Sequence, residues 1–86
     1  SKSVGEYVYF LKLDNADLKK NINLEKKINK LLGGKGFNLY ELDTQKIIYK
    51  IETKYSVEQL NLALEPDNLK LIKFNQVEDY YTLQSN

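Results

Sequence analysis

Hydrophobic and polar residues follow two periods along this chain, and the change of period divides it into strands and helices. Alternating segments rich in aromatic and β-branched residues are typical of strands, while apolar residues three and four positions apart are typical of amphipathic helices. In chain order, we predict a strand over 6–13, a helix over 17–32, strands over 37–42 and 46–53, a helix from Ser56 to before Pro66, and a strand over 69–74.

The first helix has a broad apolar stripe and a clear end. Gly33 and the glycines after it stop the helix, because glycine adopts the left-handed conformation that follows a helix at no steric cost. Leu24 and Leu31 lie off the centre of the stripe, so we expect a regular helix only from near Asn23. The stripe residues are Leu18, Ile22, Ile28 and Leu32.

The second helix has sequence signals at both ends. Ser56 and Gln59 have the spacing of a capping box, in which each side chain bonds to the backbone N–H of the other residue. Pro66 disfavours helical geometry at the residue before it, so the helix ends there.

The order β-α-β-β-α-β predicts an α+β ferredoxin-like sandwich, an antiparallel sheet with two helices on one face and the other face open. The segment 78–86 is open to three interpretations: an added C-terminal strand that folds back on the preceding one, a cover of the open face, or a loose tail. We expect a single domain over residues 1–86, with 1–5 and 84–86 as loose termini.

The composition removes most catalytic chemistry. The 86 residues include no His, Cys, Trp, Met or Arg, and all thirteen basic residues are Lys, for a formal charge of +1. Without imidazole or thiol, general acid–base, nucleophilic and soft-metal chemistry lack their usual groups. We therefore predict no enzyme activity, no metal, no cofactor and no membrane span, and a cytoplasmic protein. The Lys, Asn, Ile and Tyr bias would fit an AT-rich genome, such as that of a low-GC bacterium or of its mobile elements, a phage or plasmid.

The strand over 46–53 predicts what the open face carries. Ile47, Tyr49 and Ile51 would face the core, so that Ile48 and Lys50 face outward. Apolar side chains on an uncovered sheet face favour a binding role.

One alternative is the binding of single-stranded nucleic acid. The order of elements resembles the RNA recognition motif, and the segment 8–13 (VYFLKL) is similar to the first-strand signature of that family. The resemblance implies that Tyr9 is an exposed ring on which a base stacks. The third strand lacks the glycine of the family pattern and has Lys50 and Ile48 where further rings belong.

A second alternative is a Mg²⁺-dependent nuclease. Asp14 ends the first strand and Asp17 follows closely, and this placement resembles the small nucleases of CRISPR adaptation, which have a similar fold. The structural interpretation is a loop with a helix N-cap, and we favour it.

The leading hypothesis is a non-enzymatic module that binds another protein, or itself, through the open sheet face or an edge strand, with a homodimer favoured. On a mobile element it would act as an inhibitor or adaptor. Seven tyrosines are a high number for this length, and tyrosine is enriched at protein interfaces. Tyr80 and Tyr81 are adjacent, so they point to opposite faces. The predicted partner-binding residues are Tyr9, Lys12, Ile48, Lys50, Tyr80 and Tyr81.

Overall fold

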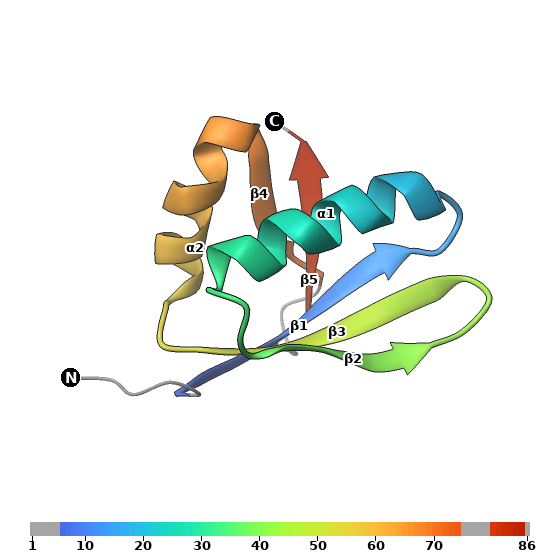
Figure 1. Ribbon diagram of the computed structural model, residues 1–86, viewed down its shortest axis with the longest axis horizontal. Coiled ribbons are helices and arrows are strands. Elements are labelled where there is room, and N and C mark those ends of the chain that lie inside the picture. The colour runs from blue at the N-terminus through green and yellow to red at the C-terminus, as the bar shows by residue number, and fades with distance from the viewer. Residues whose placement is uncertain (1–5, 75–79, 86) are drawn as a thin grey trace.

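The computed structural model describes residues 6–74 and 80–85, which form a sheet and two helices (Figure 1). The predicted α+β class and the order β-α-β-β-α-β with an added strand are confirmed. A 3₁₀ turn, Glu65–Asp67, joins the second helix to the strand that follows. The elements are β1 (Tyr7–Asp14), α1 (Leu18–Leu31), β2 (Phe37–Leu42), β3 (Lys46–Thr53), α2 (Val57–Leu64), β4 (Leu69–Lys73) and β5 (Tyr80–Ser85).

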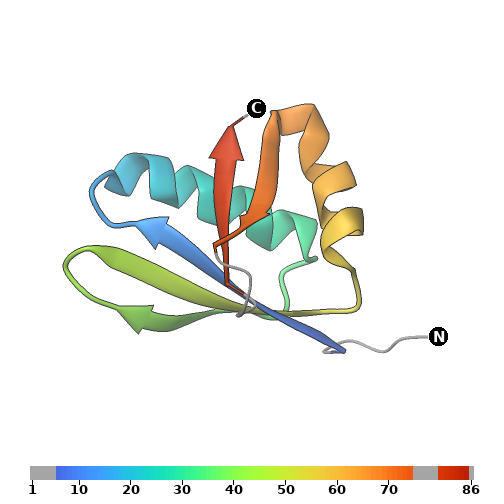
Figure 2. The ribbon, with the colours of Figure 1, turned by 180° about the vertical axis from the view of Figure 1, so that it is seen from behind.

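The sheet is mixed, with strand order β2-β3-β1-β5-β4, so the prediction of a purely antiparallel sheet was wrong. β5 does fold back on β4, but it lies between β4 and β1 and pairs parallel with β1 (Figure 2). β4 runs antiparallel to β1 in this plan, so a strand that reverses direction from β4 must run parallel to β1. β5 includes Gln84 and Ser85, which were expected in a loose terminus; residues 1–5, 78–79 and 86 lie outside the described residues.

Both helices pack on the same face of the sheet. The odd-numbered residues of β1 and β3 point to this face, because residues opposite each other in an antiparallel pair point the same way. The main core therefore lies between α1, α2 and one side of the sheet. Its buried members are Tyr9, Leu11, Leu13, Leu24, Ile28, Ile47, Tyr49, Ile51, Leu60, Leu64, Leu69 and Leu71.

Helix α1 starts earlier than predicted. The Asp17 carboxylate accepts a hydrogen bond from the Lys20 N–H at 3.0 Å, which satisfies one of the free donors of the first turn. The helix is therefore regular from Leu18, and the predicted start near Asn23 was wrong.

The inward stripe of α1 also differs from the prediction. Asn21, Leu24 and Ile28 are buried, whereas Leu18 and Ile22 are exposed to 65% and 40%. The Asn21 amide donates to the Asp14 carbonyl oxygen at 2.6 Å, which fixes this side of the helix against the end of β1. A polar residue thus occupies an inward position, and two apolar residues are left outside.

The predicted start of α2 is confirmed. The Ser56 hydroxyl accepts from the Gln59 N–H, and the Gln59 side-chain oxygen accepts from the Ser56 N–H. Within the described residues, neither helix is long and apolar enough to cross a bilayer.

Candidate binding face

The even-numbered residues of β1 and β3 form the face of the sheet that neither helix covers, called here the open face. β1 contributes Val8, Phe10 and Lys12, and the strand register places Glu52, Lys50 and Ile48 opposite them. On the other side of β1, Tyr80 and Thr82 of β5 lie beside Phe10 and Lys12. Further residues on this face are Tyr40, Glu41, Lys70, Ile72 and Phe74.

Three aromatic rings from three strands meet at the centre of the open face and form the ring cluster, Phe10, Tyr40 and Tyr80. The Phe10 and Tyr80 rings are nearly parallel, with centroids 5.0 Å apart. On the same face, Tyr40 contacts the Phe10 ring from the β2 side, opposite Tyr80, with centroids 4.8 Å apart and ring planes at 59°. Tyr40 remains more than half exposed. The cluster thus presents one continuous aromatic surface to solvent.

The ring cluster has Phe74 and Ile48 near it. The Lys12 ammonium lies 4.1 Å from the centroid of the Phe74 ring, within cation–π range, and Phe74 is more than half exposed. Ile48 is only 3% exposed but does not belong to the main core. Ile48 is therefore covered by side chains of the open face itself, which means that this face has a small packed apolar layer of its own.

The charges of the open face nearly balance. Glu41 forms an ion pair with Lys46 at 3.5 Å, at the border of the face. The remaining charged residues have both signs and no dominant field results. Along the described strands, four lysines (Lys12, Lys46, Lys50 and Lys70) stand against three carboxylates (Asp14, Glu41 and Glu52).

The structure brings four of the six predicted binding residues together on the open face. They are Lys12, Ile48, Lys50 and Tyr80. Tyr80 and Tyr81 do point to opposite faces, and Tyr81 lies on the helix side against the main core.

Tyr9 was expected on the open face, and this placement was wrong. It is a buried core residue, and its ring meets the Tyr81 ring edge-on at 5.7 Å and the Tyr7 ring at 5.9 Å. The Tyr9 hydroxyl donates to the Tyr55 carbonyl oxygen at 3.1 Å. The physical reason is strand parity, because Tyr9 has the same orientation as Leu11 and the opposite orientation to Lys12.

The buried Tyr9 phenol should make the fold sensitive to alkali. Burial is the main cause that raises the pKa of Tyr9, to about 12, with a smaller contribution from the neighbouring Tyr7 and Tyr81. In the unfolded chain this group titrates near pH 10, so its contribution to stability is complete below pH 10 and is lost between pH 10 and 12. We expect the free energy of unfolding to fall by up to about 2 kcal/mol more for the wild type than for Tyr9→Phe over that range.

Urea titrations at pH 8, 10 and 11.5 measure this difference. Tyr40→Phe is the control, because it removes the hydroxyl of an exposed tyrosine and keeps the buried Tyr9 phenol in place. If the free energy of unfolding falls equally between pH 10 and 11.5 for the wild type and Tyr9→Phe, the assignment is contradicted.

Sequence reasoning missed Phe10, Tyr40 and Phe74. For Phe10 the signal was present: Lys12 lies between Leu11 and Leu13 and must face outward, so Phe10, two residues earlier, faces outward as well. Tyr40 had no such signal, since it is the extra residue at an irregularity of pairing between Leu39 and Glu41.

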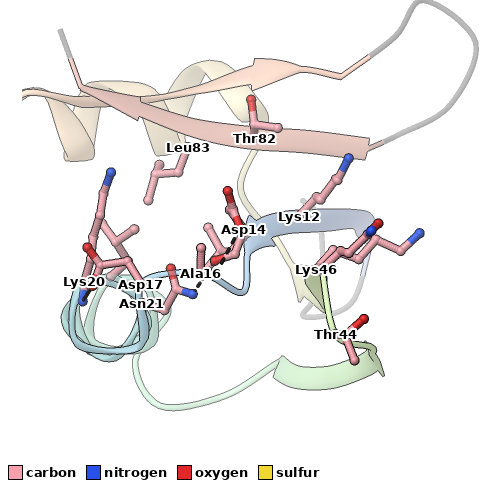
Figure 3. Close-up of a pocket in the computed structure, with 13 residues that line it drawn as sticks. Lys12, Asp14, Ala16, Asp17, Lys20, Asn21, Thr44, Lys46, Thr82 and Leu83 are labelled. Atoms are coloured by element: carbon pink, nitrogen blue, oxygen red, sulfur yellow. Dashed lines mark hydrogen bonds between the residues drawn. The ribbon is translucent and has the colours of Figure 1, made fainter.

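A hollow of about 710 Å³ lies where the carboxyl end of β1 meets the start of α1 (Figure 3). Lys12, Lys20 and Lys46 line it together with the two acidic residues of the nuclease alternative. Asp14 accepts a hydrogen bond from the Ala16 N–H at 2.9 Å, and Asp17 caps α1. In the described part of the chain, no group of three or more acidic side chains is placed to hold a metal ion. Both carboxylates stabilise local backbone structure.

Comparison with protein-family models, curated proteins and solved structures gave no significant match. The assignment of a function therefore depends on the geometry of the open face.

Proposed function

We propose that this protein is a non-enzymatic module that binds another protein through the open face. The observation that supports this most is the ring cluster, with Ile48 packed against the same side of the sheet. A protein of 86 residues has few apolar residues to spare, so aromatic rings left on an uncovered sheet face need a function. Aromatic residues with few charges among them are typical of the centre of protein interfaces.

The orientation of the rings favours a protein over a nucleic acid. Neighbouring strands are about 4.8 Å apart, and the Phe10 and Tyr80 rings stack at nearly this distance. The two rings therefore stand upright on the sheet, face against face, and expose their edges. A base stacks on the face of a ring, but Phe10 has Tyr80 on one side and Tyr40 on the other, and one face of Tyr80 is in contact with Phe10. One side of the Phe74 ring is likewise occupied by the Lys12 ammonium.

The charge of the face also favours a protein partner. A surface with four lysines and three carboxylates attracts phosphate groups weakly, and the chain has no Arg to bind them with two parallel hydrogen bonds. Lys50 and Lys70 form no ion pair among the described residues. The partner that fits is a protein with an apolar patch bordered by a few carboxylates.

Capture of a partner with matched variants tests the proposal. Tyr40→Ser and Phe74→Ser each remove an exposed ring from the open face, and Leu62→Ser removes an exposed apolar residue from α2. We expect the immobilised wild type and Leu62→Ser to retain the same protein from source-cell extract in similar amounts. The two ring variants should retain at least tenfold less of it. With the purified partner, the dissociation constant should change less than threefold between 50 and 300 mM salt.

Two results would count against the proposal. If the ring variants retain the partner as well as the wild type does, the open face is not the binding surface. If the protein instead binds labelled single-stranded oligonucleotides with an affinity that falls steeply as salt rises, the nucleic-acid alternative is correct.

A further inference from the structure

The two outer strands of the sheet, β4 and β2, differ in whether side chains bond to their outward backbone groups. At β4, the Asn61 side chain of α2 closes the edge: the Leu71 N–H donates to Asn61 Oδ1 at 2.7 Å, and Asn61 Nδ2 donates to the Leu71 carbonyl oxygen at 3.2 Å. At β2, no side chain among the described residues bonds to the outward backbone groups. An edge strand with free N–H and C=O groups is a template for another strand.

Beside this free edge lies an apolar strip made of Leu18, Ile22, Leu39 and Leu42. Leu39 and Leu42 of β2 are exposed to 58% and 59%, and both point to the helix side of the sheet. Leu18 and Ile22 belong to α1, which leaves them exposed. Four exposed apolar side chains on one side of a sheet edge are unusual for a monomer with a small core.

The orientation of α1 places Leu18 and Ile22 on the side of the helix that faces β2. Glu25 and Asn29 of α1 line a hollow with Phe37 and Tyr49, so this side of the helix faces β2 and β3. Ile22 lies three residues before Glu25, and Leu18 four residues before Ile22, so both continue the same stripe along the helix. Leu18 and Ile22 therefore lie on the side of α1 that faces β2.

We propose that β2 pairs antiparallel with β2 of a second copy of this chain, about a twofold axis near Tyr40. The two strips then meet on the helix side and cover each other. The apolar strip lies on the helix side of the sheet and the ring cluster on the open face, with Tyr40 at the edge between them, and the inference does not depend on the proposed function.

The charges at the ends of β2 support a second copy over an unrelated strand. Lys35 precedes the strand and Asp43 follows it. Antiparallel pairing of two identical strands brings Lys35 of each copy close to Asp43 of the other, so the opposite charges meet twice. Hydrogen bonds from the Gln45 and Lys46 N–H groups lower the pKa of Asp43, which keeps its carboxylate ionised at neutral pH.

The irregularity at Tyr40 fits a twofold axis between Leu39 and Tyr40. It divides the outward edge into two short segments, Phe37–Leu39 and Glu41–Leu42. About an axis between Leu39 and Tyr40, Phe37 of each copy lies opposite Leu42 of the other, and Asn38 lies opposite Glu41, so that both members of each pair point to the same face. A strand of six residues is about 20 Å long, so the seam and its side chains cover on the order of 500 Å² per copy, at the weak end of specific interfaces. We therefore expect a dissociation constant in the micromolar range.

Such a dimer would have two open faces on the same side. The twofold axis is perpendicular to the sheet, so both ring clusters point in one direction, and Tyr40 of each copy lies next to the seam. A partner with two matching sites would then gain avidity from the dimer.

Sedimentation equilibrium between about 5 and 500 µM measures the self-association. We expect a monomer–dimer equilibrium whose dissociation constant rises at least twentyfold in Leu39→Glu, because the two new carboxylates face each other near the axis. Lys35→Glu should raise it several-fold. Leu62→Glu is the control and should change it less than twofold, since Leu62 is 70% exposed on α2 beside β4, at the opposite edge of the sheet.

A disulfide test identifies the surface independently, because the chain has no Cys. Under mild oxidation at 100 µM, Leu39→Cys should give a covalent dimer, and Leu62→Cys at the same concentration should remain monomeric. A monomer at 500 µM would overturn the inference, and so would a dimer that survives Leu39→Glu, which would then use another surface. Neither result bears on the partner capture by the open face.

Discussion

Replacing Gly36 with alanine is expected to destabilise the fold by more than about 3 kcal/mol, enough to unfold much of a domain of this size. A Cβ atom at Gly36 would lie 2.0 Å from the Glu52 carbonyl oxygen, a backbone atom that no rotamer change can move away. The φ angle of Gly36 is +72°, a conformation that itself costs an L-residue about 1–2 kcal/mol. The Glu52 N–H also donates to the Gly36 carbonyl oxygen at 2.7 Å, so the clash separates β3 from the segment that leads into β2.

Gly33→Ala and Gly34→Ala are matched controls for this substitution. Both glycines have a positive φ, but nothing lies within 4 Å of an added Cβ. We expect each to cost about 1 kcal/mol, the conformational part alone. Urea denaturation followed by circular dichroism gives all three values. Equal losses for the three variants would show that the close approach to Glu52 has no energetic weight.

The sequence predicts the element order well because the signals are local. The Ser56 and Gln59 capping box and the glycines after α1 act within a few residues, and each is confirmed. The place of β5 in the sheet has no local signal. β4 and β5 form a hairpin in either arrangement, and whether β4 or β5 pairs with β1 depends on contacts between residues that are some 70 positions apart.

The stripe of α1 was misjudged because period alone does not say which stripe faces inward. Leu18 and Ile22 have the right spacing, but the Asn21 amide bonds to the end of β1 and turns the helix so that Leu24 faces the core. The exposed pair that results is part of the apolar strip beside β2. The difference between the pattern and the structure thus marks the surface to which we assign self-association.

Only some of the residues of the open face could be predicted from the sequence, and β1 shows why. Tyr9 and Lys12 differ in parity and cannot share a face of a regular strand, so the two expectations were incompatible, and Lys12 decides between them. Applying that rule would have identified Phe10. The contacts of Phe10 with Tyr40 and Tyr80 needed the structure, since they join three strands.

Two neighbouring residues of β1 should separate folding from binding. Leu11 is 1% exposed and lies in the main core between Tyr49 and Tyr81 of the adjacent strands. Leu11→Ala leaves a cavity there, and we expect a loss of about 3 kcal/mol of stability. Phe10 lies next to it on the other face.

We expect Phe10→Ala to cost less, about 1–2 kcal/mol, because it loses two ring contacts and partial burial but no place in the main core. Its effect on binding should be the larger one, since Tyr40 and Tyr80 lose the ring that holds them together. The comparison is made at a temperature where circular dichroism shows that both variants are folded. Leu11→Ala should then retain as much partner as the wild type does, and Phe10→Ala should retain at least tenfold less. If both lose the partner equally, then binding follows overall stability, and the ring cluster has no separate role in recognition.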